Sequence, residues 1–348
     1  MDSLFSDILG FLGNVAGALG AYYAGFTWSF IIDLLTDYGV FLVICLGLYI
    51  LMIAGQVSLG HAGLVGIAAY ASAILVVKFG VPFAPALPLV IVVGAVCGAV
   101  YAYLLALRLG GFYLAVGTFA LGEMMINIWL NSDYVGGAIG FVEIPFRSTS
   151  PVVGLAVAAV IYVVWRLENS RYGYAFRAIR DNEVVAGAMG VNVRRTKLLV
   201  WMIGGAIAGL GGALDAHRVT VLQPNDFGIY FSIQILLAVL LGGLASLWGT
   251  VFGAATVSLL PWMITTGDPR DRLMIYGLFI VALMVFRPQG LFMPIRGPTS
   301  GGAILRRWFG LDLGSRARSL PSGGEMAQTP PRGPGTLPPE GPIGRRQQ

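Results

Sequence analysis

Few residues in this chain could carry out chemistry, and their spacing fits no familiar catalytic motif. The 348 residues include only two histidines, His61 and His217, and two cysteines. The sequence contains no H-E-x-x-H motif, no Cys/His cluster and no G-x-S-x-G nucleophile elbow. Neither Lys78 nor Lys197 follows a glycine, so a G-x-x-x-x-G-K-[ST] phosphate loop is excluded. We therefore expect no catalytic residue, no metal and no cofactor, and ATP hydrolysis would need a separate subunit.

Polar side chains inside long apolar runs are a stronger signal, because such groups are costly in a membrane and tend to mark function. Glu123 would lie about 18 Å along a helix that begins near Gly111. The alternative for Glu123 is a structural role, in which a neutral or hydrogen-bonded carboxyl holds helices together. The alternative for His61 is a hydrogen bond that packs one helix against another. The candidates to line a path through the membrane are Gln56, Ser58, His61, Glu123 and Asn127.

The composition defines the class of protein. Of all residues, 57% are hydrophobic and 11% are charged, against about 25% charged in a typical soluble chain. The apolar runs are continuous over about twenty residues, which favours membrane-spanning helices over a barrel. The net charge of +5 does not indicate nucleic-acid binding, because no folded soluble domain is predicted. The acidic start predicts no cleaved signal peptide, and Cys45 and Cys97 are expected to be small buried hydrophobes.

The fold prediction is an all-α polytopic membrane protein with nine spans, or ten if residues 8–31 cross the membrane instead of lying at its surface. The predicted spans are residues 38–54, 61–79, 85–107, 111–130, 151–165, 198–216, 228–247, 250–264 and 273–286. Residues 55–61 form a broken or re-entrant segment, which is tolerated only where it is buried in protein or lines a cavity. Residues 58–69 resemble residues 246–255. The similarity is explained either by an internal repeat or by chance between two Gly-rich packing segments.

The longest polar interval before the C-terminal tail, residues 166–197, has seven basic and three acidic residues, which predicts a cytoplasmic loop. Residues 172–189 have the spacing of one amphipathic helix that ends at Gly190. Its predicted apolar stripe is Ala175, Ile179, Val185, Ala186 and Met189. Such a helix suits docking onto a cytoplasmic partner, with adsorption to anionic headgroups as the alternative. Residues 293–348, rich in Pro, Gly and Arg, are expected to be a disordered cytoplasmic tail.

Five motifs occur in a family order across residues 38–292, which we take as the main domain after an N-terminal segment, residues 1–37. They are G-Q-V-S-L-G-H-A-G-L-V-G-I-A-A-Y (55–70), L-A-L-R-L-G-G-F-Y-L-A-V-G-T-F-A-L-G-E (105–123), R-Y-G-Y-A-F-R-A-I-R-D-N-E-V-V-A-G-A-M-G-V-N (171–192), L-G-G-L-A-S-L-W-G (241–249) and F-R-P-Q-G-L (286–291). With these motifs the chain resembles the permease subunits of branched-chain amino-acid ABC importers, of the LivM type.

The resemblance implies a permease in the bacterial inner membrane that pairs with a similar permease, two ABC ATPase subunits and an external substrate-binding protein. The basic loop then resembles the element that couples to the ATPase, although valines follow Glu183 where the family has alanines. The coupling residues implied are Arg177, Arg180, Asp181, Glu183, Ala186 and Gly190. Related permeases carry urea or short amides. A different class, an ion-coupled carrier with Glu123 as its proton site, is the rival hypothesis.

Overall fold

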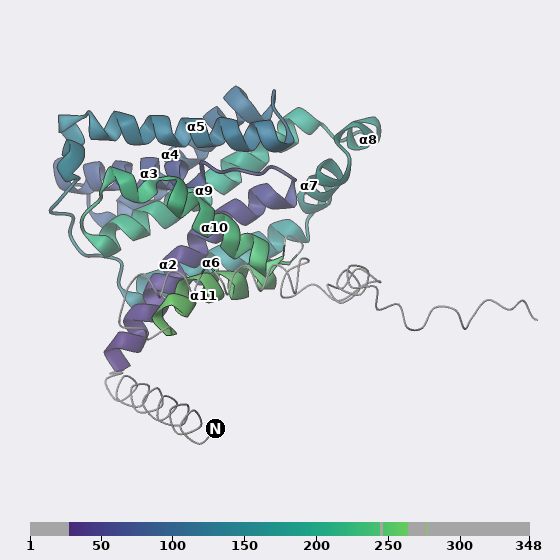
Figure 1. Cartoon of the computed structure of the whole chain (residues 1–348). Helices are drawn as coiled ribbons and strands as arrows, with labels where there is room; N and C mark the ends of the chain where they lie inside the picture. Colours follow the sequence, from purple (N-terminus) through teal and green to yellow (C-terminus); the bar gives the residue numbers. More distant parts are fainter. Residues whose placement is uncertain (1–27, 244–245, 264–276, 278–348) are drawn as a thin grey trace, which may run out of the picture. The chain divides into compact units, whose positions relative to one another are not determined.

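The computed structural model describes residues 28–243, 246–263 and 277, and in this part of the chain the structure is helical (Figure 1). The helices are α2 (Trp28–Ile53), α3 (His61–Ala73), α4 (Phe83–Tyr101), α5 (Gly111–Leu130), α6 (Ser150–Glu168), α7 (Arg171–Asp181), α8 (Glu183–Ala188), α9 (Val193–Val219), α10 (Ile229–Gly242) and α11 (Leu247–Met263). Short π-helical turns extend α3 (Ile74–Lys78) and α4 (Ala102–Ala106). Single 3-10 turns lie at Asp133–Val135, Gly137–Ile139 and Pro224–Phe227.

Seven helical segments of the described chain are long and apolar enough to cross a membrane, and α11 supplies a shorter apolar helix. The all-α polytopic class is therefore confirmed. The helix predicted over 111–130 has the bounds of α5, whereas α2 begins at Trp28 and so extends into the segment assigned to 1–37. The possible span at 8–31 lies almost wholly outside the described residues. The span at 273–286, except residue 277, and the tail at 293–348 also lie outside them.

Helix α9 is the centre of the bundle and packs against α2, α3 and α4. Its contact with α4 is a contact between backbones. A Cβ atom built on Gly98 would lie 2.1 Å from the carbonyl oxygen of Trp201, and one on Gly94 would lie 2.3 Å from that of Gly205. Small residues allow such approach, and close packing with interhelical hydrogen bonds is what associates helices in a membrane. The high glycine content of the sequence is thus used at helix crossings.

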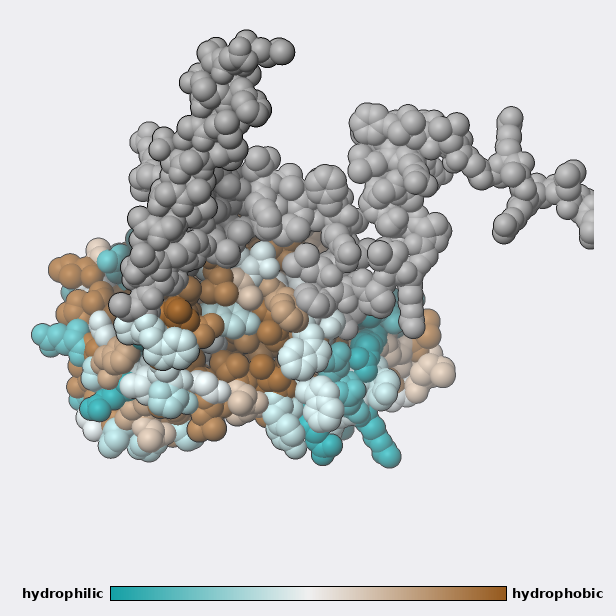
Figure 2. Space-filling view, turned by 90° about the horizontal axis from the view of Figure 1, so that it is seen from below, coloured by the Kyte–Doolittle hydropathy of each residue, from teal (hydrophilic) through white to brown (hydrophobic). Residues whose placement is uncertain are grey.

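The two ends of the bundle differ in chemistry. Helices α7 and α8 lie together at one end, which we call the loop end, on the right in Figure 1. Figure 2 shows hydrophobic residues over the middle of one face and hydrophilic residues towards both sides of it, most of them at the lower right. At the opposite end Arg218 forms ion pairs with Asp33 and Asp37, with N–O distances of 3.2 and 2.6 Å. These pairs join the end of α9 to the beginning of α2.

The prediction of one continuous helix over 172–189 is wrong. The chain breaks at Asn182, which is extended (φ −163°), between α7 and α8. The Asn182 side-chain oxygen accepts hydrogen bonds from the amides of Val184 and Val185, at 3.0 and 3.1 Å. Asparagine at this position caps a new helix, because its side chain satisfies amides that have no partner in the first turn. The predicted stop is present: α8 ends at Ala188, and Gly190 has a φ of +88°.

Candidate functional site

The predicted interruption between α2 and α3 is present and is non-helical from Ala54 to Gly60. Helix α2 ends at Ile53, and Gly55 turns the chain with a φ of +71°. The next residues bring His61 back alongside α2, where His61 Nε2 lies 3.3 Å from the carbonyl oxygen of Ile44. Because Ile44 precedes the end of α2 by more than two helical turns, the segment re-enters the bundle from the loop end.

Side chains of other helices form hydrogen bonds with backbone amides of the re-entrant segment and of the first turn of α3. The amide of Leu59 donates to Thr118 Oγ1 on α5 at 3.1 Å, and the amide of Ala62 donates to Ser232 Oγ on α10 at 3.2 Å. A Cβ atom on Gly60 would lie 1.8 Å from the carbonyl oxygen of Thr118. Irregular backbone at membrane depth requires such internal partners. In this conformation the segment is therefore largely packed in protein, with Gln56, Ser58 and Gly60 buried.

Three of the predicted path residues lie on this segment and are buried: Gln56, Ser58 and His61. Gln56 Oε1, Ser58 Oγ and His61 Nδ1 have no hydrogen-bond partner among the described residues. A buried polar atom without a partner costs roughly 1–3 kcal/mol, and such atoms are rare in native proteins. Three such atoms thus lie within six residues of this segment. Their role in a path stays a prediction.

Cysteine at position 58 tests whether the segment opens. The side chain of Ser58 has no exposed surface, so we expect the Ser58→Cys thiol to be inert towards a small water-soluble reagent in the resting protein and to react during transport. Labelling is followed by mass spectrometry, with Ala188→Cys on the exposed surface of α8 as the reactive control. Reaction at rest would contradict the packed conformation, and inertness in both conditions would remove Ser58 from the path.

Glu123 and Asn127 lie elsewhere, on the outward face of α5. The buried face of that helix carries Thr118, Gly122 and Ile126, whereas Asn127 is exposed and Glu123 is half-buried. Both side chains thus lie off the face of α5 on which Thr118 and Gly122 contact the re-entrant segment. The Glu123 carboxylate has no hydrogen bond or ion pair with any described residue. A role as a tie between helices thus has no partner inside the described chain and stays untested.

A third polar side chain extends this face by one turn. Asn127 Nδ2 donates to the carbonyl oxygen of Glu123, and Asn131 Nδ2 donates to that of Asn127, both at 2.8 Å. Residues four apart share a helix face, so Glu123, Asn127 and Asn131 form a row that we call the α5 polar stripe. A charged residue facing lipid is costly. The stripe therefore indicates that this face of α5 meets protein or water in the assembled molecule.

Helix α8 exposes apolar side chains at the loop end, though not all those of the predicted stripe. Val184 and Val185 are exposed, and Met189, directly after the helix, is 81% exposed. Ala186 is only 3% exposed because it packs against its own chain, and Ile179 of α7 is buried as well. We call Val184, Val185 and Met189 the α8 apolar surface. Exposed apolar groups in a polar loop mark an interaction site.

The charged residues predicted to couple with a partner are largely engaged within the chain. Arg177 lies 3.6 Å from Glu168 and also donates to its carbonyl oxygen, and Arg180 pairs with the exposed Asp181. Glu183 and Lys197 form an ion pair of 2.8 Å. Because Lys197 is buried and lies on α9, this pair ties α8 to the membrane helices. Sequence reasoning did not assign a role to Lys197.

Other residues of the site were also missed, and two carried a readable signal. Asn131 continues the spacing of Glu123 and Asn127, so the four-residue rule predicts it. Asn182 followed by Glu183 is the start of a helix, with a capping side chain and an acidic first residue. Thr118 and Ser232 had no signal, because only the folded structure brings them to the re-entrant backbone.

The fold and these features together define a class: a multi-pass helical membrane protein with a re-entrant segment in the bundle and short helices presented at one end. The family can also be named. The chain belongs to the branched-chain amino acid transport system / permease component family, whose pattern matches residues 30–286. It is thus a transport permease of the ABC type, as the resemblance of its motifs implied.

Curated relatives agree on the permease role and differ in what they carry. The chain is 28% identical to the high-affinity branched-chain amino acid transport system permease protein LivM of Escherichia coli (strain K12), over 78% of this chain and 73% of that protein. It is 30% identical to the galactose/methyl galactoside import permease protein MglC of Haemophilus influenzae, over 64% and 74%. It is 26% identical to the autoinducer 2 import system permease protein LsrC of Enterobacter sp., over 71% and 72%. No solved structure matches the chain significantly.

Proposed function

We propose that this chain is one permease subunit of an ATP-driven importer for branched-chain amino acids in a bacterial inner membrane. The α5 polar stripe is the observation that carries the proposal. The chain presents Glu123 and Asn127 on a face that no described helix covers, so a second permease subunit facing this helix would complete a polar path between the two. An external binding protein would deliver the substrate to that path.

The loop end supports coupling to an ATPase. The α8 apolar surface offers the exposed anchor of a helix-in-groove interaction, with the exposed carboxylate of Asp181 on α7 beside it to fix the register. The loop is basic overall, which supports a cytoplasmic position for it. The C-terminal tail, after the predicted last span, would lie on the same side.

The substrate class is supported by relatives and not by a described pocket. LivM relatives favour branched-chain amino acids, whereas MglC and LsrC carry other solutes, and urea or short amides are further candidates. Uptake of labelled leucine, galactose and urea into vesicles with the complete transporter decides among them. We expect leucine uptake, and uptake of galactose or urea alone would contradict the proposal.

The energy source separates the importer from an ion-coupled carrier with Glu123 as its proton site. We expect uptake that requires ATP on the cytoplasmic side and persists when an uncoupler removes the proton gradient. Uptake that follows the gradient, in vesicles without any ATPase subunit, would overturn the importer. Vesicles prepared from the same permease, with and without the ATPase subunits, supply the two measurements.

Substitution of Glu123 tests the path. Because its carboxylate has no described partner, we expect Glu123→Gln and Glu123→Leu both to fold normally, as judged by thermal unfolding in detergent. Glu123→Gln keeps a polar side chain of similar shape and is expected to retain most uptake. Glu123→Leu makes this position apolar and is expected to reduce uptake at least roughly tenfold, about 1.4 kcal/mol. Val116→Leu, on the same face, is the control and should leave uptake unchanged.

Loss of uptake in Glu123→Gln with normal folding would show instead that the charge itself is needed. Normal uptake in Glu123→Leu would remove this face of α5 from the path. Unfolding of Glu123→Leu, with Glu123→Gln still folded, would indicate that the carboxyl holds helices together.

A further inference from the structure

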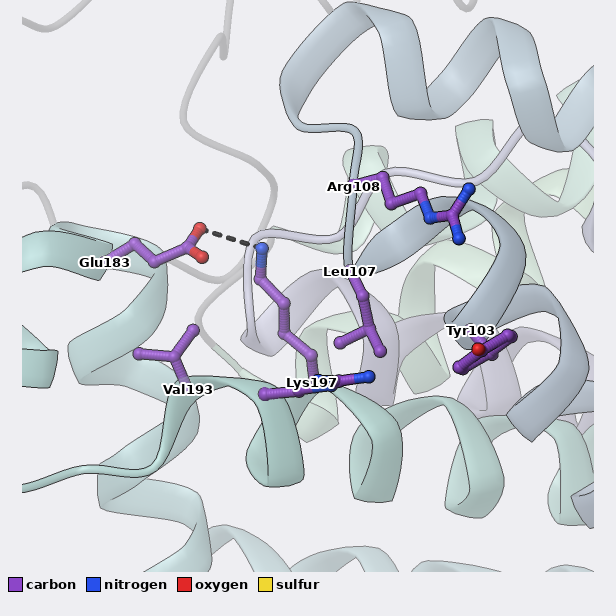
Figure 3. A pocket seen from close by; sticks show the side chains of 7 residues that line it. Tyr103, Leu107, Arg108, Glu183, Val193 and Lys197 are labelled. Carbon is purple, nitrogen blue, oxygen red and sulfur yellow. Dashed lines mark ion pairs between the residues drawn. The ribbon is translucent and has the colours of Figure 1, made fainter.

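A basic pocket of about 440 Å³ opens at the loop end of the bundle, and nothing in the transport proposal uses it (Figure 3). Arg108 and Tyr103 lie on one side of it and Glu183 and Val193 on the other, with Lys197 between them. Arg194 completes the basic lining. The pocket is thus formed where α4 ends, α9 begins and α8 passes, at the level where membrane spans meet water.

The pocket carries uncompensated positive charge. The buried Lys197 ammonium lies 2.8 Å from the Glu183 carboxylate and 3.4 Å from the carbonyl oxygen of Ala106, so its charge is matched within the chain. Arg108 and Arg194 are exposed and form no ion pair with any residue that the structure describes. The first turn of α9 adds the partial positive charge of a helix N-terminus. A pocket with two free guanidinium groups selects an anion, and phosphate fits their fork geometry.

An apolar surface leads into the same pocket from the membrane. Exposed side chains three or four residues apart form one row along α4: Leu89, Val92, Val96, Val100 and Tyr103. The row ends at Tyr103, which lines the basic pocket. An apolar groove of about 240 Å³ flanks it between α4 and α5 and includes Val100 and Leu104. Unlike the α5 polar stripe, this row has no polar side chain before Tyr103, so it is suited to acyl chains.

We propose that the pocket binds the phosphate group of an anionic phospholipid whose acyl chains lie along the exposed row of α4. Basic pockets between spans recognise acidic headgroups, at about 1 kcal/mol for each basic residue. Tyr103 stands at the boundary between the two parts, where tyrosine is favoured in membranes. The same phosphate chemistry could come from a soluble anion, and the two sources differ in whether the apolar row is needed.

The test is lipid retention by the purified full transporter in native mass spectrometry, with phosphatidylglycerol and phosphatidylcholine of equal chain length. We expect wild type to prefer phosphatidylglycerol, and the double variant Arg108→Ala with Arg194→Ala to lose that preference by roughly 30-fold. Arg195→Ala is the matched control, because Arg195 is the exposed neighbour on α9 and does not line the pocket. The readout is binding, so it does not depend on the transported substrate.

Three outcomes would overturn the proposal. One is an unchanged lipid preference in the double variant, and another is an equal loss in Arg195→Ala. The third is protection by inorganic phosphate alone against thermal unfolding, equal to that by phosphatidylglycerol, which would assign the pocket to a soluble anion. In the first of these cases, loss of the ATPase subunit from the double variant would assign the two arginines to protein docking instead.

Discussion

Met189→Glu is expected to abolish co-purification of the ATPase subunit while the permease still inserts and folds. Met189 is the most exposed long apolar side chain of the α8 apolar surface, and loss of a buried interface anchor costs about 2 kcal/mol or more, roughly 30-fold in affinity. A carboxylate placed in an apolar groove adds a desolvation cost. The measurement is the amount of ATPase retained with the tagged permease in detergent.

Three control variants separate loss of docking from loss of folding. Val219→Glu makes the same kind of change on an exposed apolar residue at the opposite end of α9, and it should retain the ATPase. Ala186→Glu, on a side chain buried in the chain's own packing, should instead destabilise the permease itself, and Arg194→Ala should change retention little. Normal ATPase retention by Met189→Glu would mean that docking occurs away from α8 and that the loop lies on the membrane.

Gly60→Ala is expected to prevent stable folding, because the new methyl group would lie 1.8 Å from the carbonyl oxygen of Thr118. The φ of Gly60 is −104°, which any residue can adopt, so the effect is steric and not conformational. The contacted atoms belong to the backbone of Thr118 and Phe119, and the position of the new methyl group is fixed by the backbone of residue 60, so no side-chain rotation relieves the contact. We expect a loss of at least about 3 kcal/mol in stability, the upper range for overpacking.

Thermal unfolding and size-exclusion chromatography in detergent measure this effect. Gly154→Ala on α6 is the matched control, because nothing lies within 4 Å of its new methyl group. That change should shift stability by less than about 1 kcal/mol, in the favourable direction for a helix. A Gly60→Ala protein as stable as wild type would show that α3 and α5 can separate here, and that the re-entrant segment is not held as described.

Helix positions could be predicted from the sequence because membrane spans are long apolar runs and because glycines often stand at their ends. Gly110 and Gly111 begin α5 and Asn131 ends it, at the bounds that the sequence predicts. The break after α2 also followed, since residues 55–59 interrupt two apolar runs and are too few for an ordinary loop. Each of these signals is local, so no knowledge of neighbouring helices was needed.

The faces of the helices could not be predicted in the same way. An apolar helix gives little contrast between its sides, so Glu123 and Gln56 were grouped as one path without any signal of their different burial: Gln56 is buried and Glu123 is half-buried. At the loop end the apolar spacing continues from Ile179 to Ala186 across Asn182, because seven residues are two helical turns whether or not the helix is broken. Contrast between buried and exposed positions there depends on packing against α9, which no local pattern encodes.

The backbone contacts between α4 and α9 have a mechanical consequence. At Gly98 and Gly205 no side chain separates the two helices, so they cannot slide past each other without backbone collisions, and close-packed elements move as units. We therefore expect α4 and α9 to behave as a rigid body during transport. Alternation between inward and outward openings would then arise by rotation of this pair against α5 and α10, with bending in the segments that join them, residues 107–110 and 220–228.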